Sequence, residues 1–215
     1  MTCFDIVLST SASLHPEIEP KVFISAYHGV IRAQGEDGVL RRVGCAHAWR
    51  VHIGLVANQG ESLLDVFAAH KQPMYDLYAA LFDPETDYFT HDIVRQFMAM
   101  DPDLLVLDYV VLSPRWRGLK LGLLATRKMV DLLGGGCGLV VYHIAPLRRD
   151  AHRMLRVPKA WLPRQKSAES RKHAVVKLRR YFRQMGFERI GRTSYYGLSM
   201  ARKVPTLADL LQPSP

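Results

Sequence analysis

The turn at residues 113–122 carries residue types that bind phosphate groups. It reads Ser-Pro-Arg-Trp-Arg-Gly-Leu-Lys-Leu-Gly and follows a nearly continuous apolar run. If a strand ends there and a helix begins, the first N–H groups of the helix lack intrahelical acceptors and point outward. The helix dipole and the charges of Arg115, Arg117 and Lys120 would strengthen their attraction for anions. The turn therefore predicts a diphosphate site.

Other sequence motifs for phosphate or metal chemistry are missing. There is no Walker A pattern and no Gly-x-Gly-x-x-Gly after a strand, which argues against a nucleoside triphosphatase and a dinucleotide-binding Rossmann site. The nine histidines show no metal-ligand spacing, so we expect no metal. Cys3, Cys45 and Cys137 are odd in number and far apart, which argues against a disulfide framework and favours a reducing compartment.

The elements around the turn follow from the apolar pattern. Residues 104–112 (LLVLDYVVL) predict a strand buried on both faces, with Asp108 as its lone acid. A helix is expected over 118–133, closed by three glycines, and a second strand over 139–145. A strand, a helix and a strand in this order predict two parallel strands joined by a right-handed crossover.

The remaining chain predicts more strands and helices around this unit. We expect strands at 4–8, 22–27, 39–55, 187–190 and 194–201, helices at 63–70, 74–82, 92–100 and 174–185, a long basic loop at 148–173, and a short terminal helix near Thr206. Core packing is the better interpretation of the apolar residues in the aromatic helix at 74–82.

Composition and charge limit the class of protein. The chain has 215 residues, 48% of them apolar and 23% charged, which is typical of a globular protein. No apolar run is long enough to span a membrane and no basic segment precedes an apolar N-terminus, so we expect a cytoplasmic protein. Residues 115–203 hold 22 Lys and Arg against four acids, whereas the rest holds seven against sixteen. This imbalance predicts a polyanionic ligand (nucleic acid, acidic membrane or phosphate-bearing cofactor), the alternative being a solvated basic face.

Two separate motifs in the second half have the order and spacing of one family's signatures. A strand end, Leu-Ser-Pro at 112–114, precedes Arg-Gly-Leu-Lys-Leu-Gly at 117–122. An aromatic-x-x-x-Gly-Phe segment follows at 182–187, before a strand that ends in TSYYGLSM. Over about residues 104–203 the chain resembles the GNAT superfamily of acyl-CoA-dependent N-acyltransferases.

Four features depart from that family pattern. The asparagine that is common after the family's fifth strand is not evident in HIAPLRRD, at 143–150. Lys120 replaces a motif glycine, and its side chain could either crowd a bound diphosphate or add a contact to it. Phe182 stands where many members carry a tyrosine that protonates the departing thiolate, and Tyr181, one position earlier, is expected to point elsewhere. The basic loop at 148–173 is longer than the usual family connection.

The resemblance implies a fold of the α/β (α+β) class, a mixed and strongly twisted central sheet with helices on both faces. The parallel strands at 104–112 and 139–145 would splay apart, and the pantetheine of acyl-CoA would enter between them. One domain would span 1–215, with a cofactor half at 104–203 and an acceptor half at 1–103. Because members of the family usually place their acceptor-binding helices early, the helix at 74–82 could border the acceptor site. The implied cofactor-binding residues are Val110, Val111, Leu112, Arg117, Gly118, Leu119, Lys120, Leu121, Gly122 and Phe182.

The implied reaction transfers an acetyl group from acetyl-CoA, a co-substrate, to a primary amine by direct attack. Asp108 is the expected base, because a lone carboxylate among apolar residues should have a raised pKa; the alternative is simple pairing with a basic neighbour or a backbone donor. The N–H of Val110 or Val111 would stabilise the oxyanion. The candidates for the acid are Tyr196 and His143, with Tyr142 and Tyr195 as weaker ones.

Two other functions stay open at this point. Residues 148–172 carry nine Lys and Arg, with Trp161 among them, and could dock a nucleic acid that bears the amine, such as aminoacyl-tRNA. Alternatively, the changes at Lys120 and Phe182 have disabled catalysis and left a module that binds acyl-CoA. The sequence leaves open the acceptor amine, the acyl length and the oligomeric state, a homodimer included, and it predicts no membrane partner.

Overall fold

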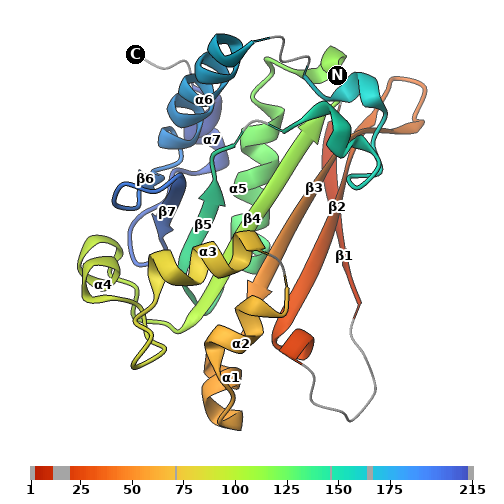
Figure 1. Cartoon of the computed structure of the whole chain (residues 1–215). Coiled ribbons are helices and arrows are strands. Elements are labelled where there is room, and N and C mark those ends of the chain that lie inside the picture. Colours follow the sequence, from red (N-terminus) through yellow and green to blue (C-terminus); the bar gives the residue numbers. More distant parts are fainter. Residues whose placement is uncertain (1–2, 12–19, 71, 146, 164–166, 213–215) are drawn as a thin grey trace.

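One mixed sheet forms the centre of the molecule (Figure 1). The computed structural model describes residues 3–11, 20–70, 72–145, 147–163 and 167–212. In these ranges seven strands pair in the order β1-β2-β3-β4-β5-β7-β6. They are β1 (Cys3–Thr10), β2 (Ile24–Gln34), β3 (Leu40–Val51), β4 (Asp103–Leu112), β5 (Cys137–His143), β6 (Glu188–Arg189) and β7 (Tyr195–Ser199). β4 and β5 are parallel and the other neighbours antiparallel, which confirms the predicted α/β class and the parallel pair.

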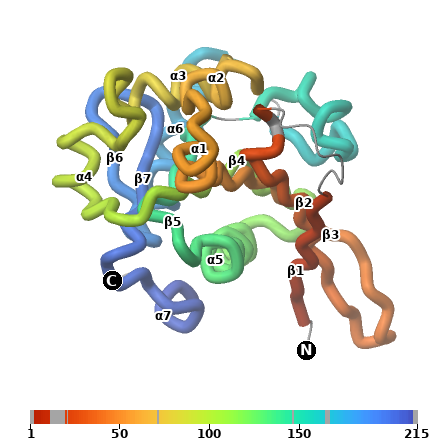
Figure 2. The backbone as a smooth tube through the Cα atoms, turned by 90° about the horizontal axis from the view of Figure 1, so that it is seen from below, coloured from red at the N-terminus to blue at the C-terminus, as the bar shows by residue number. Residues whose placement is uncertain are grey.

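Helices cover both faces of this sheet. They are α1 (Ile53–Gln59), α2 (Leu63–Ala68), α3 (Gln72–Leu81), α4 (His91–Phe97), α5 (Leu121–Leu133), α6 (Ala168–Arg183) and α7 (Leu207–Leu211). Figure 2 shows α1, α2 and α3 on one face and α5 and α7 on the other. Among the described residues, no helix has both the length and the apolar character that crossing a bilayer requires.

Alternate residues of β4 supply the two apolar cores. Leu104 and Val106 pack with side chains of α1 to α4, whereas Leu105 and Leu107 pack with those of α5, α6 and α7. Successive side chains of a strand point to opposite faces, so a strand with a core on each side needs a continuous apolar run. The run at 104–112 meets that requirement, and the predicted strand is confirmed.

The connection from β4 to α5 is tighter than the sequence suggested. A 3-10 turn, η2 (Pro114–Trp116), follows β4 directly. α5 begins at Leu121 rather than at 118, because Gly118 and Lys120 have φ values of +81° and +56°, which lie outside the helical region. The predicted strand–turn–helix junction is therefore present, with a sharply bent backbone just before the helix.

The expected basic loop at 148–173 is wrong in part, because much of it is ordered. It contains the 3-10 segments η3 (Arg149–His152) and η4 (Lys159–Trp161), and it ends in the first residues of α6. Leu155 and Val157 are buried against Tyr109, so apolar contacts hold the segment against β4. α6 starts earlier than the predicted helix because Ser167 caps it, with Oγ accepting a hydrogen bond from the N–H of Ser170.

Two further boundaries in the first half differ from the sequence-based expectation. β2, which follows the 3-10 turn η1 (Pro20–Phe23), runs to Gln34 rather than ending at 27, because it pairs with β1 on one side and β3 on the other. The end of the predicted strand 39–55 folds into α1 instead. Both differences come from pairing and packing partners that are distant in sequence.

Candidate functional site

A cavity of about 560 Å³ lies at the N-terminus of α5. The end of β4, the turn before α5, the end of β5 and α6 form its wall. The lining residues are Val110, Leu112, Arg117, Gly118, Lys120, Leu121, Gly122, Thr126, Tyr142, Lys177, Leu178, Tyr181, Phe182 and Gln184. Eight of the ten residues expected to bind a cofactor are among them. The other two lie elsewhere, since Val111 is buried with Tyr109 on the opposite face and Leu119 is 55% exposed.

The turn before α5 presents a run of free backbone donors. Among the described residues, the N–H groups of 118–122 have no hydrogen-bond acceptor, and the N–H of Leu123 is the first to bond, to the carbonyl of Lys120. The left-handed backbone at Gly118 and Lys120 produces this arrangement. Free N–H groups at the start of a helix attract anions, and α5 is 13 residues long. This end of the cavity therefore offers free donors that suit an anion, and we call it the anion-binding end.

Two of the three cations of this turn, Arg117 and Lys120, are engaged by carbonyl oxygens, whereas the guanidinium of Arg115 lies 5.4 Å from the centre of the Trp116 ring. Nε and Nη2 of Arg117 donate to the carbonyl of Leu112 at 3.1 and 3.0 Å, and Nη2 also donates to that of Trp161. Burial lowers the pKa of Arg117. The ammonium of Lys120 donates to the carbonyl of Leu210, at 2.9 Å, and to that of Gln212, at the end of α7. Lys120 thus anchors the terminal helix, which neither of the two expectations for its side chain included.

Three aromatic side chains, those of Tyr142, Tyr181 and Phe182, form part of the cavity wall. Phe182 packs on Tyr142 with ring centroids 4.0 Å apart. The expectation that Tyr181 points elsewhere is wrong, because it lines the same cavity. Its hydroxyl lies 2.8 Å from the position that a Cβ on Gly122 would occupy, so the missing side chain of Gly122 makes room for it. Burial and the neighbouring Tyr142 raise the pKa of Tyr181 well above its usual value.

β4 and β5 part beside this cavity, and Asp108 lies at the point where they do. Their parallel pairing ends at Leu107 and Tyr142, and Figure 1 shows the two strands running apart beyond it. On the other side of β4, the register against β3 passes from Leu107 to Tyr109 and skips Asp108, which marks a β-bulge. Asp108 and Tyr109 both contact His47, so the bulge brings two consecutive side chains to one face.

The carboxylate of Asp108 is paired with a buried histidine. Oδ2 lies 3.1 Å from Nδ1 of His47, whose side chain is 9% exposed against 35% for that of Asp108. His47 also contacts the rings of His28, Trp49 and Tyr109, at centroid distances of 4.7, 5.0 and 5.5 Å. We call these five residues the His47 cluster. It lies on the sheet face opposite the core of α5 to α7, and Asp108 is its half-exposed acid.

The two acid candidates lie in different surroundings. His143 follows Tyr142 at the end of β5; its Nε2 lies 2.9 Å from Oγ of Ser194, and burial lowers its pKa while the charges of Asp108 and Asp76 oppose that shift. Tyr196 is 2% exposed, pairs with Tyr142 across β5 and β7, and is not among the residues lining the cavity. Of the two, His143 is therefore the one within electrostatic reach of Asp108.

The two weaker candidates for the acid, Tyr142 and Tyr195, lie on opposite faces of the sheet. Tyr142 lines the cavity at the last position of β5 that pairs with β4. Burial, with a smaller contribution from Asp108, raises its pKa far above the usual value. Tyr195 lies on the opposite face, where its hydroxyl donates to the carbonyl of Pro73 at 2.9 Å. Burial raises the pKa of Tyr195 to about 12.

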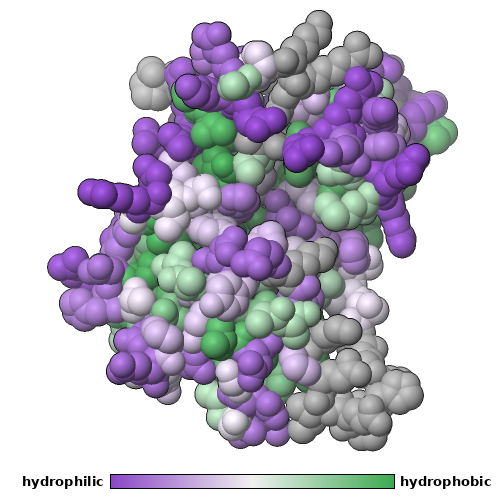
Figure 3. Space-filling view, in the orientation of Figure 1, coloured by the Kyte–Doolittle hydropathy of each residue, from purple (hydrophilic) through white to green (hydrophobic). Residues whose placement is uncertain are grey.

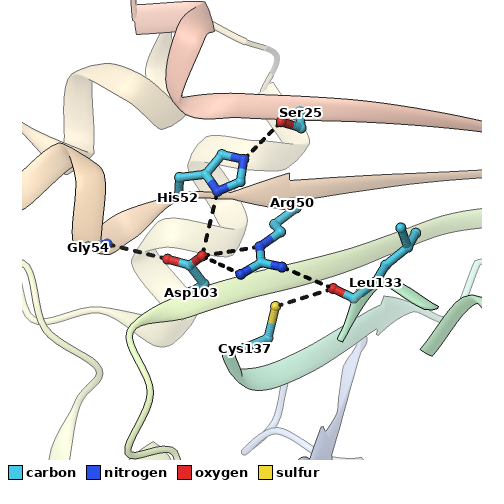
Figure 4. A network of polar contacts seen from close by, with 7 residues as sticks. All are labelled: Ser25, Arg50, His52, Gly54, Asp103, Leu133 and Cys137. Carbon is cyan, nitrogen blue, oxygen red and sulfur yellow. Dashed lines mark hydrogen bonds and ion pairs between the residues drawn. The ribbon is translucent and has the colours of Figure 1, made fainter. Parts of the chain in front are cut away.

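A second polar network lies at the other end of β4 (Figure 4). Nε and Nη2 of Arg50 donate to Oδ2 of Asp103 at 3.1 and 2.8 Å, and Nδ1 of His52 lies 3.5 Å from the same oxygen. The N–H of Gly54 donates to the other oxygen, and Oγ of Ser25 lies 2.8 Å from Nε2 of His52. These contacts join the ends of β2, β3 and β4. The guanidinium of Arg50 neutralises the carboxylate of Asp103, which is also the oxygen partner of His52.

Sequence reasoning missed His47 and misplaced Tyr181. A histidine inside the apolar stretch of 39–55 was a visible signal, but its partner depends on the register of β3 against β4. Among the described residues, no group of three or more His, Cys, Asp and Glu is arranged to hold a metal.

Comparison with known proteins adds no assignment to this geometry. No protein-family model matches the chain, no curated protein matches it, and no solved structure matches it. What the site can do must therefore be inferred from its own residues.

Proposed function

We propose that the protein is an acyl-CoA-dependent N-acyltransferase of the GNAT type, which transfers an acetyl group from acetyl-CoA to a primary amine. One observation carries the proposal: the parallel strands part between an anion-binding cavity and a half-exposed carboxylate. The cavity suits a phosphate-bearing thioester carrier, and Asp108 suits the deprotonation of an amine. Both sites border the same gap in strand pairing after Leu107.

The cavity supports the binding of coenzyme A at both of its ends. The free N–H groups of 118–122 would hold the diphosphate, with the hydroxyl of Tyr181 beside them. Val110, Leu112 and Phe182 would pack against the pantetheine. A volume of about 560 Å³ is within the range of small-molecule sites. Beyond Leu107, β4 has no partner in β5, so its backbone on that side is available to an extended ligand.

The chemistry follows from the groups on either side of the gap. The amine gives a proton to Asp108, its nitrogen forms a bond to the thioester carbonyl carbon, and the carbon–sulfur bond breaks. The N–H of Val110 would stabilise the oxyanion. We assign protonation of the leaving thiolate to Tyr142, because it lines the cavity at the parting. Asp108 then releases its proton to solvent, and Tyr142 takes one up from solvent, which returns both residues to their starting state. Phe182 packs against Tyr142 and so supports it.

The deciding experiment is calorimetric titration with acetyl-CoA and with coenzyme A. A Cβ at Gly122 would displace the hydroxyl of Tyr181, whereas one at Gly135 meets no atom within 4 Å. Gly122→Ala should therefore weaken coenzyme A binding about tenfold, the loss expected for one or two hydrogen bonds, and Gly135→Ala should leave it unchanged. No heat of binding in the unmodified protein would overturn the proposal. Binding without thiol release from acetyl-CoA across a panel of amines would leave an acyl-CoA-binding module instead.

A nucleic-acid-linked amine is a second candidate acceptor, favoured by the surface of α6. The helix carries the basic residues Arg171, Lys172, Lys177, Arg179, Arg180 and Arg183, with Glu169 as its one acid. Among the described residues, none of these six makes an ion pair. RNA binding whose affinity falls steeply with salt would support this version, and no binding at low salt would remove it.

A further inference from the structure

The sheet face that carries the His47 cluster has an acidic side, where Asp76 of α3 and Asp108 of β4 act on His143 at the end of β5. The hydroxyl of Tyr195 bonds the carbonyl of Pro73 in α3, and its ring lies 4.9 Å from that of His143. Asp76 is in the next turn of α3, and its charge, like that of Asp108, opposes the lowering of the pKa of His143 by burial. Two carboxylates therefore act on one imidazole at this side.

The opposite side of the same face is basic. Leu155 and Val157 pack with Tyr109, which fixes Arg156 between them. Nη2 of Arg42 donates to the carbonyl of Arg156 at 3.4 Å, and its guanidinium lies 5.8 Å from the centre of the Trp161 ring. No carboxylate among the described residues forms an ion pair with either arginine. Both guanidinium charges are thus available to an anion.

The His47 cluster lies between these two sides. Burial, followed by Cys45 and Asp108, raises the pKa of Tyr109 to about 12, while the charges of Arg42 and Arg156 act to lower it. Arg156 also helps to lower the pKa of His28, after burial and His47. Figure 3 shows the face hollowed between α3 and the segment that holds η3 and η4, with hydrophilic residues around the hollow. The carboxylate of Asp108 and the guanidinium groups of Arg42 and Arg156 therefore act with opposite sign on the same side chain, that of Tyr109.

We propose that the acceptor is a primary amine that carries an anionic group, a carboxylate or a phosphate, with the amine at Asp108 and the anion at Arg42 and Arg156. This inference rests on the proposed acyl transfer and names its substrate class. A simple alkylamine would leave both guanidinium groups without a counter-charge, and a simple anion would face two carboxylates. A ligand with both charges satisfies both sides, which is the usual basis of electrostatic specificity.

The test compares amines of matched size with acetyl-CoA present. Propylamine carries only the amine, β-alanine adds a carboxylate, and O-phosphoethanolamine adds a phosphate. Comparing the last two shows whether the site prefers a carboxylate or a phosphate. Thiol release should give a kcat/KM at least about tenfold higher for one anionic amine than for propylamine, through a lower KM. Arg156→Gln should abolish that ratio. Arg153→Gln, an exposed arginine in the same segment, is the matched control and should retain it.

A binding measurement separates this inference from the acyl-transfer proposal. Ring resonances of His28 and His143 should shift on titration with the preferred anionic amine at concentrations about tenfold lower than with propylamine or acetate. Equal rates and equal binding for charged and simple amines would overturn the inference, as would a preference that survives Arg156→Gln. Failure of acetyl-CoA to bind in the calorimeter would overturn acyl transfer alone, because the ring titration needs no cofactor.

Discussion

Two aspartates of β4, five positions apart, differ in how many hydrogen bonds the protein gives their carboxylates and in how exposed they are. Asp103, the first residue of β4, accepts hydrogen bonds from Arg50 and from the N–H of Gly54, and its side chain is 14% exposed. Asp108, at the bulge, has His47 as its partner and is 35% exposed. A carboxylate can accept about four hydrogen bonds. The first is largely satisfied by the protein, whereas the second keeps capacity for a substrate.

The two surroundings also differ in what they connect. Asp103 lies in a network that includes Ser25, His52 and, through Arg50 and the carbonyl of Leu133, the thiol of Cys137 (Figure 4). It therefore ties together strand ends and contributes to stability. Asp108 lies where β4 has lost its partner in β5 and its regular register with β3. Irregular positions in a strand re-aim side chains, and functional groups are often found there.

The largest effect should come from Asp108→Asn. The amide keeps the shape and the contact to His47 but cannot accept the proton of the amine. We expect kcat to fall by roughly 10²–10⁴, the usual contribution of a general base, with acetyl-CoA affinity within about twofold of normal. Steady-state thiol release and calorimetry measure the two quantities. Turnover within about threefold of normal would remove Asp108 from the mechanism.

Asp103→Asn should give the reverse pattern. Removing one charge from a partly buried pair leaves Arg50 without its counter-charge, and we expect a loss of about 2–3 kcal/mol in the free energy of unfolding. Urea denaturation measures it. Once the variant is folded, its turnover should stay within about twofold of normal, since no catalytic group contacts Asp103. A large loss of turnover with unchanged stability would contradict the comparison.

The histidines that contact the two aspartates, His47 and His52, should differ in their effects on kcat and on stability. His47→Leu should lower kcat about tenfold by releasing the carboxylate of Asp108, and His47→Asn, whose amide can replace Nδ1, should restore most of it. His52→Leu should leave kcat unchanged and reduce the free energy of unfolding by about 1–2 kcal/mol, because it removes the hydrogen bond to Ser25 and the contact to Asp103. Full kinetics of the three variants with coenzyme A binding as control would show whether His47 positions the base. No difference between His47→Leu and His47→Asn would argue for a purely structural role.

The smallest effect that we expect is a pH dependence of the free energy of unfolding, caused by Asp103. Hydrogen bonds from His52 and Arg50 outweigh burial and hold the pKa of Asp103 below its usual value. A carboxyl whose folded pKa is below its unfolded pKa, about 3.9, contributes stability above that pH and loses it as the pH falls through the folded pKa. The stability difference between the unmodified protein and Asp103→Asn should therefore be full at pH 6 and shrink below about pH 4. Denaturation curves at a series of pH values measure it, and a difference that grows toward acid would be inconsistent with this sign.

The sequence by itself determined the central unit of this protein. A continuous apolar run, a proline, glycines and a helical repeat are local signals, and they specified β4, the bend before α5 and the parallel strand β5. The terminal helix was equally local, since Thr206 and Asp209 form its capping box. Asp108 could be singled out because an acid in an apolar run is conspicuous without any partner in view.

Only the tertiary structure decided what surrounds that acid and the bend. The pairing of His47 with Asp108 depends on a bulge that shifts the register of two strands some sixty residues apart. Lys120 finds its acceptors 90 residues later in α7, and Tyr181 reaches the cavity because Gly122 has no side chain. Such contacts depend on how distant segments pack, and a local pattern carries no information about the distance between them.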